Sequence, residues 1–338
     1  MAADRPLIAR TLPTCLYIEV TNRCNSLCET CPRTFVTREP LGDIRWEDFT
    51  HVVDSNPVLN RVVLHGIAEP LMHKDLLKMI AYLKDRQVYV LFNTNAVLLK
   101  RPLQEKLIAS GLDELRISLD GSTAETYFKI RGIPALDKVL KHSAQMVQTQ
   151  RALGAANPKL SFVFTGMKAN LPELPDVIRI AHRIGMPEVY LQRLTYFDDG
   201  LATADQAIFT AYGADAEEQR IIAECERLAN AFGIRFNGSG ATTARQSLEQ
   251  SGERPAHPWQ RCLRPWTVGY ITANGNALPC CIAPFTGAPY GDMILGNAFA
   301  EGGFASVYNS PRYVRFREQF LSDTPPASCV GCGSKWSL

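Results

Sequence analysis

The sequence has no long hydrophobic run and no excess of charge of one sign. No window approaches the ~18 apolar residues of a membrane-spanning helix, and residues 1–14 contain no apolar stretch long enough for a signal peptide. The 36 Lys and Arg residues nearly balance the 34 Asp and Glu residues without any run of like charges, which argues against a nucleic-acid-binding surface. We therefore expect a cytoplasmic protein with neither a membrane nor a nucleic-acid partner.

The order of apolar runs predicts an α/β fold. The chain of 338 residues is long enough for one large core and a smaller second one. Strands separated by helices run parallel, and right-handed crossovers place their carboxyl ends on one rim. We expect an N-terminal extension over 1–14 and a partial (βα)6 barrel over 15–235. Its strands are predicted from short β-branched or aromatic runs at residues 16–20, 62–66, 88–93, 115–119, 160–165 and 189–194.

The last third of the chain has a different pattern. Residues 236–258 are rich in Gly, Ser and polar side chains and are predicted to be a linker or surface loop. Beyond it, Asn274-Gly275 lies between two strand-like runs and predicts a β-hairpin, because both positions tolerate positive φ. With a helix over about 303–321, residues 259–338 are expected to form a small C-terminal domain of hairpin plus helix.

Ten cysteines in a reducing compartment favour metal binding or catalysis over disulfides. Cys24, Cys28 and Cys31 directly follow the first predicted strand, on the rim where barrels carry their functional groups. A structural zinc site uses four protein ligands, whereas three thiolates on a four-iron cluster leave one iron open for a small molecule. A zinc knuckle or a simple thiol pair is the alternative interpretation.

These motifs carry a resemblance to the radical S-adenosylmethionine (SAM) enzymes, which extends along most of the chain. Residues 24–31, CNSLCETC, have that family's CxxxCxxC pattern. Its GGEP motif resembles residues 66–70 (GIAEP), its TNG element residues 93–95 (NTN), and its SLDG element residues 117–121 (ISLDG). Arg131-Gly132 follows in the place of the family's RG pair.

Two positions depart from the family pattern. Thr30 stands where an aromatic residue often precedes the third cysteine and packs on adenine. Ile67-Ala68 replace the glycines of GGEP, which keeps the backbone groups but narrows the pocket.

The resemblance implies that Cys24, Cys28 and Cys31 hold a [4Fe-4S] cluster whose open iron chelates SAM. One electron from the reduced cluster then cleaves SAM to a 5′-deoxyadenosyl radical, which abstracts hydrogen from a substrate. A flavodoxin- or ferredoxin-type reductant is the implied electron donor. An ordinary capped turn or a surface ion pair is the alternative for the residues outside the cysteine loop. By the same resemblance, Glu69 binds the SAM ammonium, in a segment that also contains Gly66 and Ala68. The SAM carboxylate is assigned to Ser118 or Arg131. Asn95, Asn93 or Asp120 would hold the ribose hydroxyls or the surrounding loop.

A second cysteine set comprises Cys262, Cys280, Cys329 and Cys332 and resembles the auxiliary-cluster region of SPASM and twitch extensions. Too few cysteines remain for the seven of a full SPASM set, so the twitch type with one auxiliary [4Fe-4S] cluster fits better. Cys281 is an alternative to Cys280, because pleat alternation turns only one of two neighbours inward. A four-cysteine zinc ribbon is the alternative to a cluster.

Candidate substrate and catalytic residues lie at the ends of two strands. His65 ends the second predicted strand, while Arg193, Tyr196 and Asp198-Asp199 follow the sixth. An Arg and a Tyr could anchor a carboxylate or sugar hydroxyls, although a packed histidine and a solvated loop are equally open. Trp259 and Trp266 flank Cys262 as candidate pocket walls, with an aromatic core as the alternative.

Only about fifteen residues precede the first strand, whereas peptide maturases commonly carry an N-terminal recognition domain. We therefore expect a small substrate such as a sugar or nucleoside. The resemblance favours decarboxylation of a nucleoside-linked sugar acid in antibiotic biosynthesis, similar to the cytosylglucuronate decarboxylases of blasticidin-type pathways. The alternatives are dehydrogenation or epimerisation of an aminoglycoside, radical maturation of a ribosomal peptide, and a zinc-stabilised binding module without catalysis.

Overall fold

The computed structural model describes residues 5–197, 200–208, 215–239, 242–243, 262–330 and 332. Within these residues one sheet of 11 strands has the order β11-β10-β9-β1-β2-β3-β4-β5-β6-β7-β8. Strands β1 to β7 and β9 run parallel, and β8, β10 and β11 are antiparallel to their neighbours. The predicted α/β fold with a parallel partial barrel is confirmed. The strands are β1 (Cys15–Ile18), β2 (Arg61–Val63), β3 (Tyr89–Thr94), β4 (Glu114–Ser118), β5 (Lys159–Gly166), β6 (Glu188–Arg193), β7 (Arg235–Gly238), β8 (Thr242–Thr243), β9 (Val268–Ile271), β10 (Asn276–Leu278) and β11 (Gly296–Asn297).

All six predicted barrel strands form, with ends within three residues of the prediction. Strands β1 and β2 are shorter than predicted. Their ladders nevertheless continue for one residue, because the N–H groups of Glu19 and Leu64 donate to the carbonyls of Ile271 and Leu91.

The prediction that residues 236–258 form a loop is wrong at its start. Strand β7 pairs in parallel with β6 and adds a seventh barrel strand, and β8 follows it. Arg235 and Asn237 of β7 both bind the Glu188 carboxylate of β6, at 2.9 and 3.2 Å. A strand stabilised by such polar cross-strand pairs lacks the apolar pattern that marks a strand in a sequence. Residues 244–258 lie outside the described residues.

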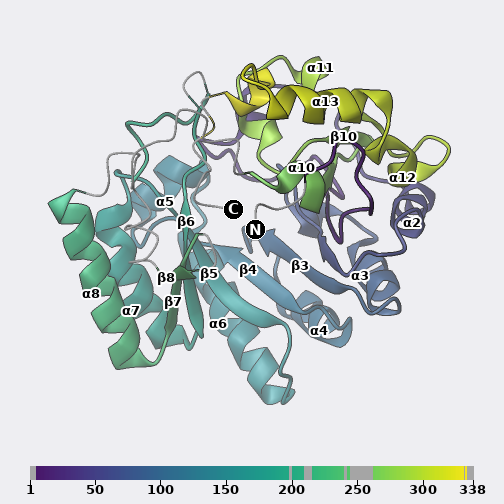
Figure 1. Ribbon diagram of the computed structural model, residues 1–338. Helices are drawn as coiled ribbons and strands as arrows, with labels where there is room; N and C mark the ends of the chain where they lie inside the picture. Colours follow the sequence, from purple (N-terminus) through teal and green to yellow (C-terminus); the bar gives the residue numbers. More distant parts are fainter. Residues whose placement is uncertain are drawn as a thin grey trace.

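Helices cover the outer face of the sheet. Figure 1 shows α3, α4, α6, α7 and α8 side by side outside the barrel strands, and α11 to α13 over the end that holds β10. At least one helix lies between consecutive strands from β1 to β7, as the parallel arrangement predicts. The helices are α1 (Pro32–Phe35), α2 (Trp46–Asp54), α3 (Leu76–Lys84), α4 (Arg101–Ala109), α5 (Ala124–Arg131), α6 (Leu136–Ala152), α7 (Leu174–Ile184), α8 (Ala216–Phe232), α10 (Arg264–Thr267), α11 (Tyr290–Met293), α12 (Gly303–Tyr308) and α13 (Pro311–Leu321). Short 3-10 turns are η1 (Pro70–Met72), η2 (Leu171–Glu173), η4 (Ala283–Phe285) and η5 (Ala327–Cys329).

The predicted single helix over 303–321 is wrong, because two helices, α12 and α13, occupy this segment. Pro311 begins α13 and has no N–H to continue the hydrogen bonds of α12. The Ser310 side chain accepts from the Tyr313 N–H (3.3 Å) and starts the new helix.

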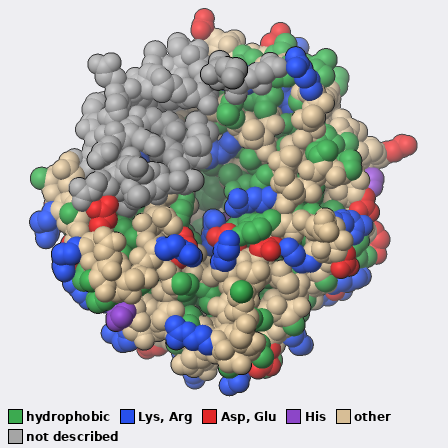
Figure 2. Space-filling model, turned by 60° about the horizontal axis from the view of Figure 1, so that its bottom comes forward, with side chains coloured by type: hydrophobic (Ala, Val, Ile, Leu, Met, Phe, Trp, Pro, Cys, Tyr) green, Lys and Arg blue, Asp and Glu red, His purple; other side chains and the backbone are tan. Residues whose placement is uncertain are grey.

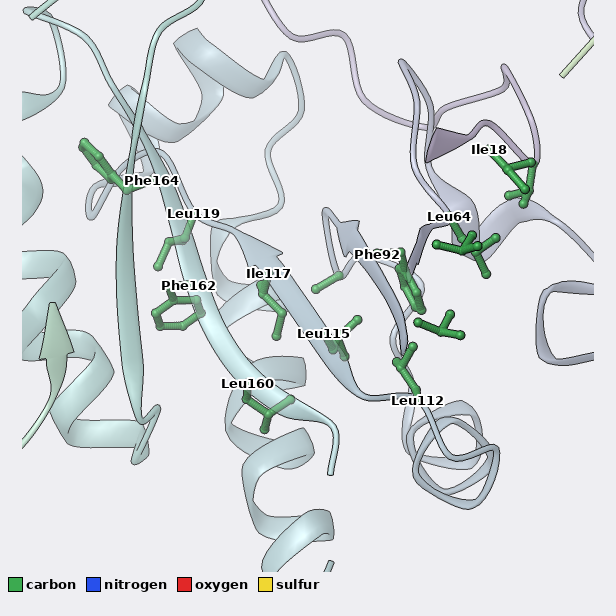
Figure 3. Close-up of a cluster of buried hydrophobic side chains, with 14 of the residues drawn as sticks. Ile18, Leu64, Phe92, Leu112, Leu115, Ile117, Leu119, Leu160, Phe162 and Phe164 are labelled. Carbon is green, nitrogen blue, oxygen red and sulfur yellow. The ribbon is translucent and has the colours of Figure 1, made fainter. Parts of the chain in front are cut away.

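Alternation along the strands separates an apolar outer face from a polar interior. In β4, Leu115 and Ile117 are fully buried, and they gather with Phe92 and Phe162 of the neighbouring strands (Figure 3). The intervening residues, such as Arg116 and Ser118, point to the opposite face and line a cavity inside the barrel. The core therefore lies between sheet and helices and leaves the interior free for a site.

The predicted hairpin is confirmed and continues the barrel sheet. Strands β9 and β10 flank Asn274-Gly275, and the φ of Gly275 is +87°. Strand β9 pairs in parallel with β1, from Cys15 with Val268 to Ile18 with Ile271. None of the described helices is long and apolar enough to cross a membrane.

Candidate functional site

The three-cysteine loop follows β1 and is held from two sides. On one side, Asn95 after β3 donates from Nδ2 to Asn25 Oδ1 (2.7 Å) and Ser26 Oγ (2.9 Å). On the other side, the N–H of Leu27 donates to the carbonyl of Arg131 (3.1 Å) at the end of α5. Of the two roles predicted for Asn95, these contacts support holding the surrounding loop over binding ribose.

Gly132 shows why a glycine follows Arg131. Its φ is +67°, in the left-handed region, and a Cβ at this position would lie 2.3 Å from the carbonyl oxygen of Leu27. Any larger residue would push the cysteine loop away from α5.

Cys24, Cys28 and Cys31 are half-buried and line one cavity. Burial raises the pKa of Cys31 to about 12, and the neighbouring Cys28 thiol adds to the effect. Such a thiol ionises when a metal replaces its proton. No three His, Cys, Asp or Glu side chains among the described residues group closely enough to hold a single metal ion. Because each thiolate of a four-iron cluster binds a different iron, three separated thiols fit a cluster with one open iron.

Glu69 is buried, with 2% exposure, and ties the end of the second βα unit to the third. Its Oε1 accepts from the Leu71 N–H (3.1 Å) and the Thr94 hydroxyl (2.7 Å), and its Oε2 accepts from the Asn95 N–H (2.7 Å). Burial raises the pKa of Glu69 although these hydrogen bonds oppose the shift. From the described residues Oε2 accepts one bond, which leaves a lone pair for the predicted SAM ammonium.

Asp120 and Arg131 form a buried ion pair, with Nη2 and Oδ2 2.6 Å apart. Asp120 Oδ1 also accepts from the Thr165 N–H (2.7 Å), and Arg131 Nη1 lies 3.7 Å from the Cys28 sulfur. Burial opposes the charged guanidinium, but Asp120 and the Cys28 thiol outweigh it and raise the pKa of Arg131. Both residues, predicted to bind SAM, are thus already paired with each other beside a cysteine.

A cavity of about 500 Å³ brings most predicted site residues together. Figure 2 shows a hollowed face of the molecule, with Lys or Arg and hydrophobic side chains around the hollow. The cavity is lined by residues from every motif of the radical SAM resemblance and by two candidate substrate residues. The predicted residues in its lining are Cys24, Cys28, Cys31, His65, Gly66, Ala68, Glu69, Asn93, Asn95, Ser118, Asp120, Arg131 and Arg193.

Arg193 and Tyr196, the two substrate candidates after the sixth strand, lie in different environments. Arg193 is buried at the end of β6 and lines the cavity, and burial lowers its pKa to about 10. Tyr196 instead packs in a small hydrophobic cluster with Ile130, Met167 and Leu194, and it is not among the described residues that line the cavity. Tyr196 therefore lies behind cavity-lining residues, and its role toward the substrate stays a prediction. Asp198 and Asp199 lie outside the described residues.

Trp266, one of the two candidate pocket walls, is not among the described residues that line the cavity. The Trp266 indole donates to the carbonyl of Pro6 (2.8 Å) and packs edge-on against Phe320. Trp266 thus packs against the N-terminal segment and Phe320, which agrees with the alternative that it belongs to an aromatic core. Trp259 lies outside the described residues.

Several polar residues of the barrel interior were missed from the sequence. In β4 the order Glu-Leu-Arg-Ile-Ser alternates polar and apolar residues, which was the available signal that one face is polar. The missed residues that line the cavity include Tyr17, Arg116, Tyr190, Gln192 and Arg264.

Glu19 is a buried carboxylate that was also missed, with 2% exposure. Its Oε2 accepts from the Ile67 N–H (2.9 Å) and the Tyr270 hydroxyl (2.9 Å), and Oε1 accepts from the Ala273 N–H (3.3 Å). Burial raises its pKa to about 7 against these hydrogen bonds. A Cβ on Gly66 would lie 2.1 Å from Oε2, so only glycine fits beside it. Glu19 thus joins the GGEP-like loop to the C-terminal hairpin.

The second cysteine set also converges. Cys262 precedes α10, Cys280 follows β10, and Cys329 and Cys332 lie at the end of the described chain. Burial raises the pKa of Cys280 to about 12, with further increases from Cys281, Cys262 and Cys332. Burial also raises the pKa of Cys329, and Cys280, Cys332 and Cys262 add to the shift. The four predicted ligands therefore lie near one another.

Cys281 faces a different environment from Cys280. It lines the large cavity, where the side chains of Arg264 and Tyr17 hydrogen-bond to its sulfur. This placement supports Cys280 as the ligand, and the assignment stays a prediction.

Two family models match the chain on either side of residues 150–261. Residues 18–149 match the Radical SAM superfamily, and residues 262–333 match SPASM, an iron-sulfur cluster-binding domain. The chain carries a radical SAM domain and a SPASM domain. The radical SAM domain implies SAM and a [4Fe-4S] cluster, and the SPASM domain implies additional iron–sulfur clusters, which confirms the predicted cofactors. All four predicted auxiliary ligands fall within the SPASM match.

Several known proteins are similar to this chain over most of its length. The "PqqA peptide cyclase" of Granulibacter bethesdensis is 22% identical over 95% of this chain and 79% of its own length. The "Mycofactocin maturase MftC" of Mycobacterium ulcerans is 26% identical over 95% of this chain and 80% of its own. The structure of Streptococcus suis SuiB bound to S-adenosylmethionine has the same fold, with a TM-score of 0.68 and 16% sequence identity. The match covers 91% of this chain and 68% of SuiB. The specific similarity to a cytosylglucuronate decarboxylase is unconfirmed by these relatives.

Proposed function

We propose that this chain is a radical SAM enzyme that abstracts hydrogen from a peptide and thereby matures it. The observation that carries the radical chemistry is the cavity into which the three cysteines, Glu69, Ser118 and Arg131 all face. The peptide substrate is supported by similarity, over 95% of the chain, to a protein named a peptide cyclase, and by SuiB, also solved bound to its precursor peptide SuiA. The short segment before β1, which favoured a small substrate, is a weaker guide than similarity along the whole barrel.

When bound and reduced, the cluster and SAM supply the radical that removes a hydrogen atom from a C–H bond. The chain's residues hold and orient these groups. Cys24, Cys28 and Cys31 would hold the cluster, and Glu69 Oε2 would accept from the ammonium of SAM. Because Arg131 is paired with Asp120, Ser118 is the better candidate for the SAM carboxylate, and the ion pair instead fixes α5 against the cysteine loop.

Anaerobic purification with iron and sulfide analysis, followed by reduction in the presence of SAM, tests the radical chemistry. About eight irons per chain are expected for two four-iron clusters, with 5′-deoxyadenosine as the product of SAM cleavage. Colourless oxygen-free protein that leaves SAM intact under a strong reductant would refute the proposal.

Two cysteine variants separate the roles of the two cysteine sets. We expect Cys28→Ala to abolish SAM cleavage, because it removes a ligand of the cluster that binds SAM. Cys329→Ala is expected to retain some uncoupled cleavage while product formation stops, because it affects only the auxiliary set. Product formation by both variants at wild-type rates would contradict the ligand assignment.

The peptide assignment is tested by deuterium transfer into 5′-deoxyadenosine from perdeuterated peptide and sugar-acid pools. Label from the peptide pool supports maturation. A nucleoside-linked sugar acid is the second candidate, favoured because the buried Arg193 lines the cavity. Label from the sugar-acid pool alone would replace the first candidate by the second.

A further inference from the structure

His65, Asn93 and Arg116 form a row across three neighbouring strands on the inside of the barrel. Asn93 of β3 pairs with Arg116 of β4, and the pairing of Val63 with Leu91 places His65 beside Asn93 two residues further along. Since neighbouring strands lie about 4.8 Å apart, the row spans roughly 10 Å. All three members of the row line the cavity.

Arg116 presents unused donors to this cavity. Its Nε donates to Glu114 Oε1 (2.6 Å), and Glu114 is not among the described residues of the cavity lining. Within the part of the chain that the structure describes, its two terminal nitrogens donate no hydrogen bond. The side chain is 27% exposed, so these nitrogens are accessible from the cavity.

His65 supplies a neutral partner on the other side of the row. Its Nδ1 is buried and has no hydrogen-bond partner among the described residues. Burial, followed by the charges of Arg116 and Arg131, lowers the pKa of His65 to about 4. The ring is neutral at pH 7 and keeps one N–H donor.

We propose that Arg116, with His65 beside it, binds a carboxylate of the substrate on the inner wall of the barrel. A guanidinium only donates, and its planar pair of terminal nitrogens matches the two oxygens of a carboxylate. Arg116 lies two residues before Ser118 and so about 7 Å further from the strand end that leads to the SAM motifs. The inference rests on the proposed function, and it makes the substrate acidic.

The carboxylate has two possible sources in a peptide, an acidic side chain or the C-terminus. Three probes of nearly equal size separate them. N-acetylglutamic acid α-amide carries only the side-chain carboxylate, N-acetylglutamine carries only the terminal one, and N-acetylglutamine amide is neutral. Their binding to the SAM-loaded holoenzyme is measured by calorimetry under anaerobic conditions.

We expect one acidic probe to bind at least tenfold more tightly than the neutral amide, and to identify the source of the carboxylate. Arg116→Gln should weaken that probe at least tenfold. Arg235→Gln is the matched control, because Arg235 is also a strand arginine paired with a strand glutamate and is not among the described cavity residues. The comparison of acidic and neutral probes on the unmodified protein needs no variant to fold.

Equal binding of the acidic and neutral probes would overturn the inference. So would no binding at millimolar concentration, unchanged binding by Arg116→Gln, or competition of the acidic probe with SAM, which would place it in the SAM site. Cleavage of SAM by the same wild-type preparation is measured in parallel. Failure to bind the probes and failure of the radical chemistry are therefore separate results.

Discussion

Replacing Glu19 by glutamine tests whether the buried carboxyl group between the barrel and the C-terminal hairpin is charged. The carboxylate accepts three hydrogen bonds, from Ile67, Tyr270 and Ala273. A glutamine has a single acceptor oxygen, so one of these donors loses its partner. At every pH this loss is expected to destabilise the fold by about 1–3 kcal/mol.

The wild-type protein adds a pH dependence that the variant lacks. Burial raises the pKa of Glu19 from 4.5 to about 7, so the folded state favours the protonated carboxyl group. Its contribution to stability is fully present below the unfolded pKa and is lost as the pH rises through the folded one. The shift corresponds to about 3 kcal/mol, of which about 2 kcal/mol is lost between about pH 5.5 and 8.5.

The measurement compares thermal unfolding midpoints of wild-type and Glu19→Gln holoprotein across this pH range. The advantage of the wild type is expected to shrink by a few degrees as the pH rises. Tyr270→Phe removes a hydrogen bond that lowers the pKa of Glu19, so its own pH dependence is expected to be steeper than that of the wild type. A constant difference between wild type and Glu19→Gln would refute titration of Glu19 in this range, and would mean that the hydrogen bonds offset burial.

Two further substitutions probe the cysteine loop. Gly132→Ala is expected to lower the iron content, because its Cβ would meet the carbonyl of Leu27, whereas Gly233→Ala has the same φ of +67° with no atom within 4 Å and should keep the clusters at a loss of about 1 kcal/mol. Equal iron content in the two variants would contradict this reasoning. Asp120→Asn leaves the buried Arg131 without its counter-charge and is expected to destabilise the protein by about 3–5 kcal/mol, measured by its unfolding midpoint. An unchanged midpoint would show that the ion pair adds little.

The strands of the barrel were predictable because their apolar residues form short, well-separated runs. The start of α8 carries a local signal in the sequence, the capping box of Asp215 and Glu218. Strand β7 escaped prediction because Arg235 and Asn237 make it polar, and only pairing with Glu188 shows that it is a strand. Pro311 is the sequence signal for the break between α12 and α13. The periodicity of apolar residues, taken alone, does not show this break.

The site was predictable where a motif follows a strand and unpredictable within the strands. Glu69 and Asp120 were singled out because the motifs that carry them resemble those of the radical SAM enzymes, and both line the cavity. Glu19 and Arg116 were missed because a short apolar run says little about which of its polar members faces a cavity. The packing of Tyr196 could not be predicted, since Ile130 and Met167 join its cluster from distant parts of the sequence.

The pairing of β9 with β1 has a consequence for how electrons and substrate move through this protein. The strand leading to the SAM cysteines is hydrogen-bonded along four residue pairs to the strand that follows Cys262. A movement of the SPASM domain away from the barrel would break the pairing of β1 with β9. The distance between the cysteine loop after β1 and Cys262 before β9 is therefore fixed by the sheet, and the proposed turnover has to proceed without changing it.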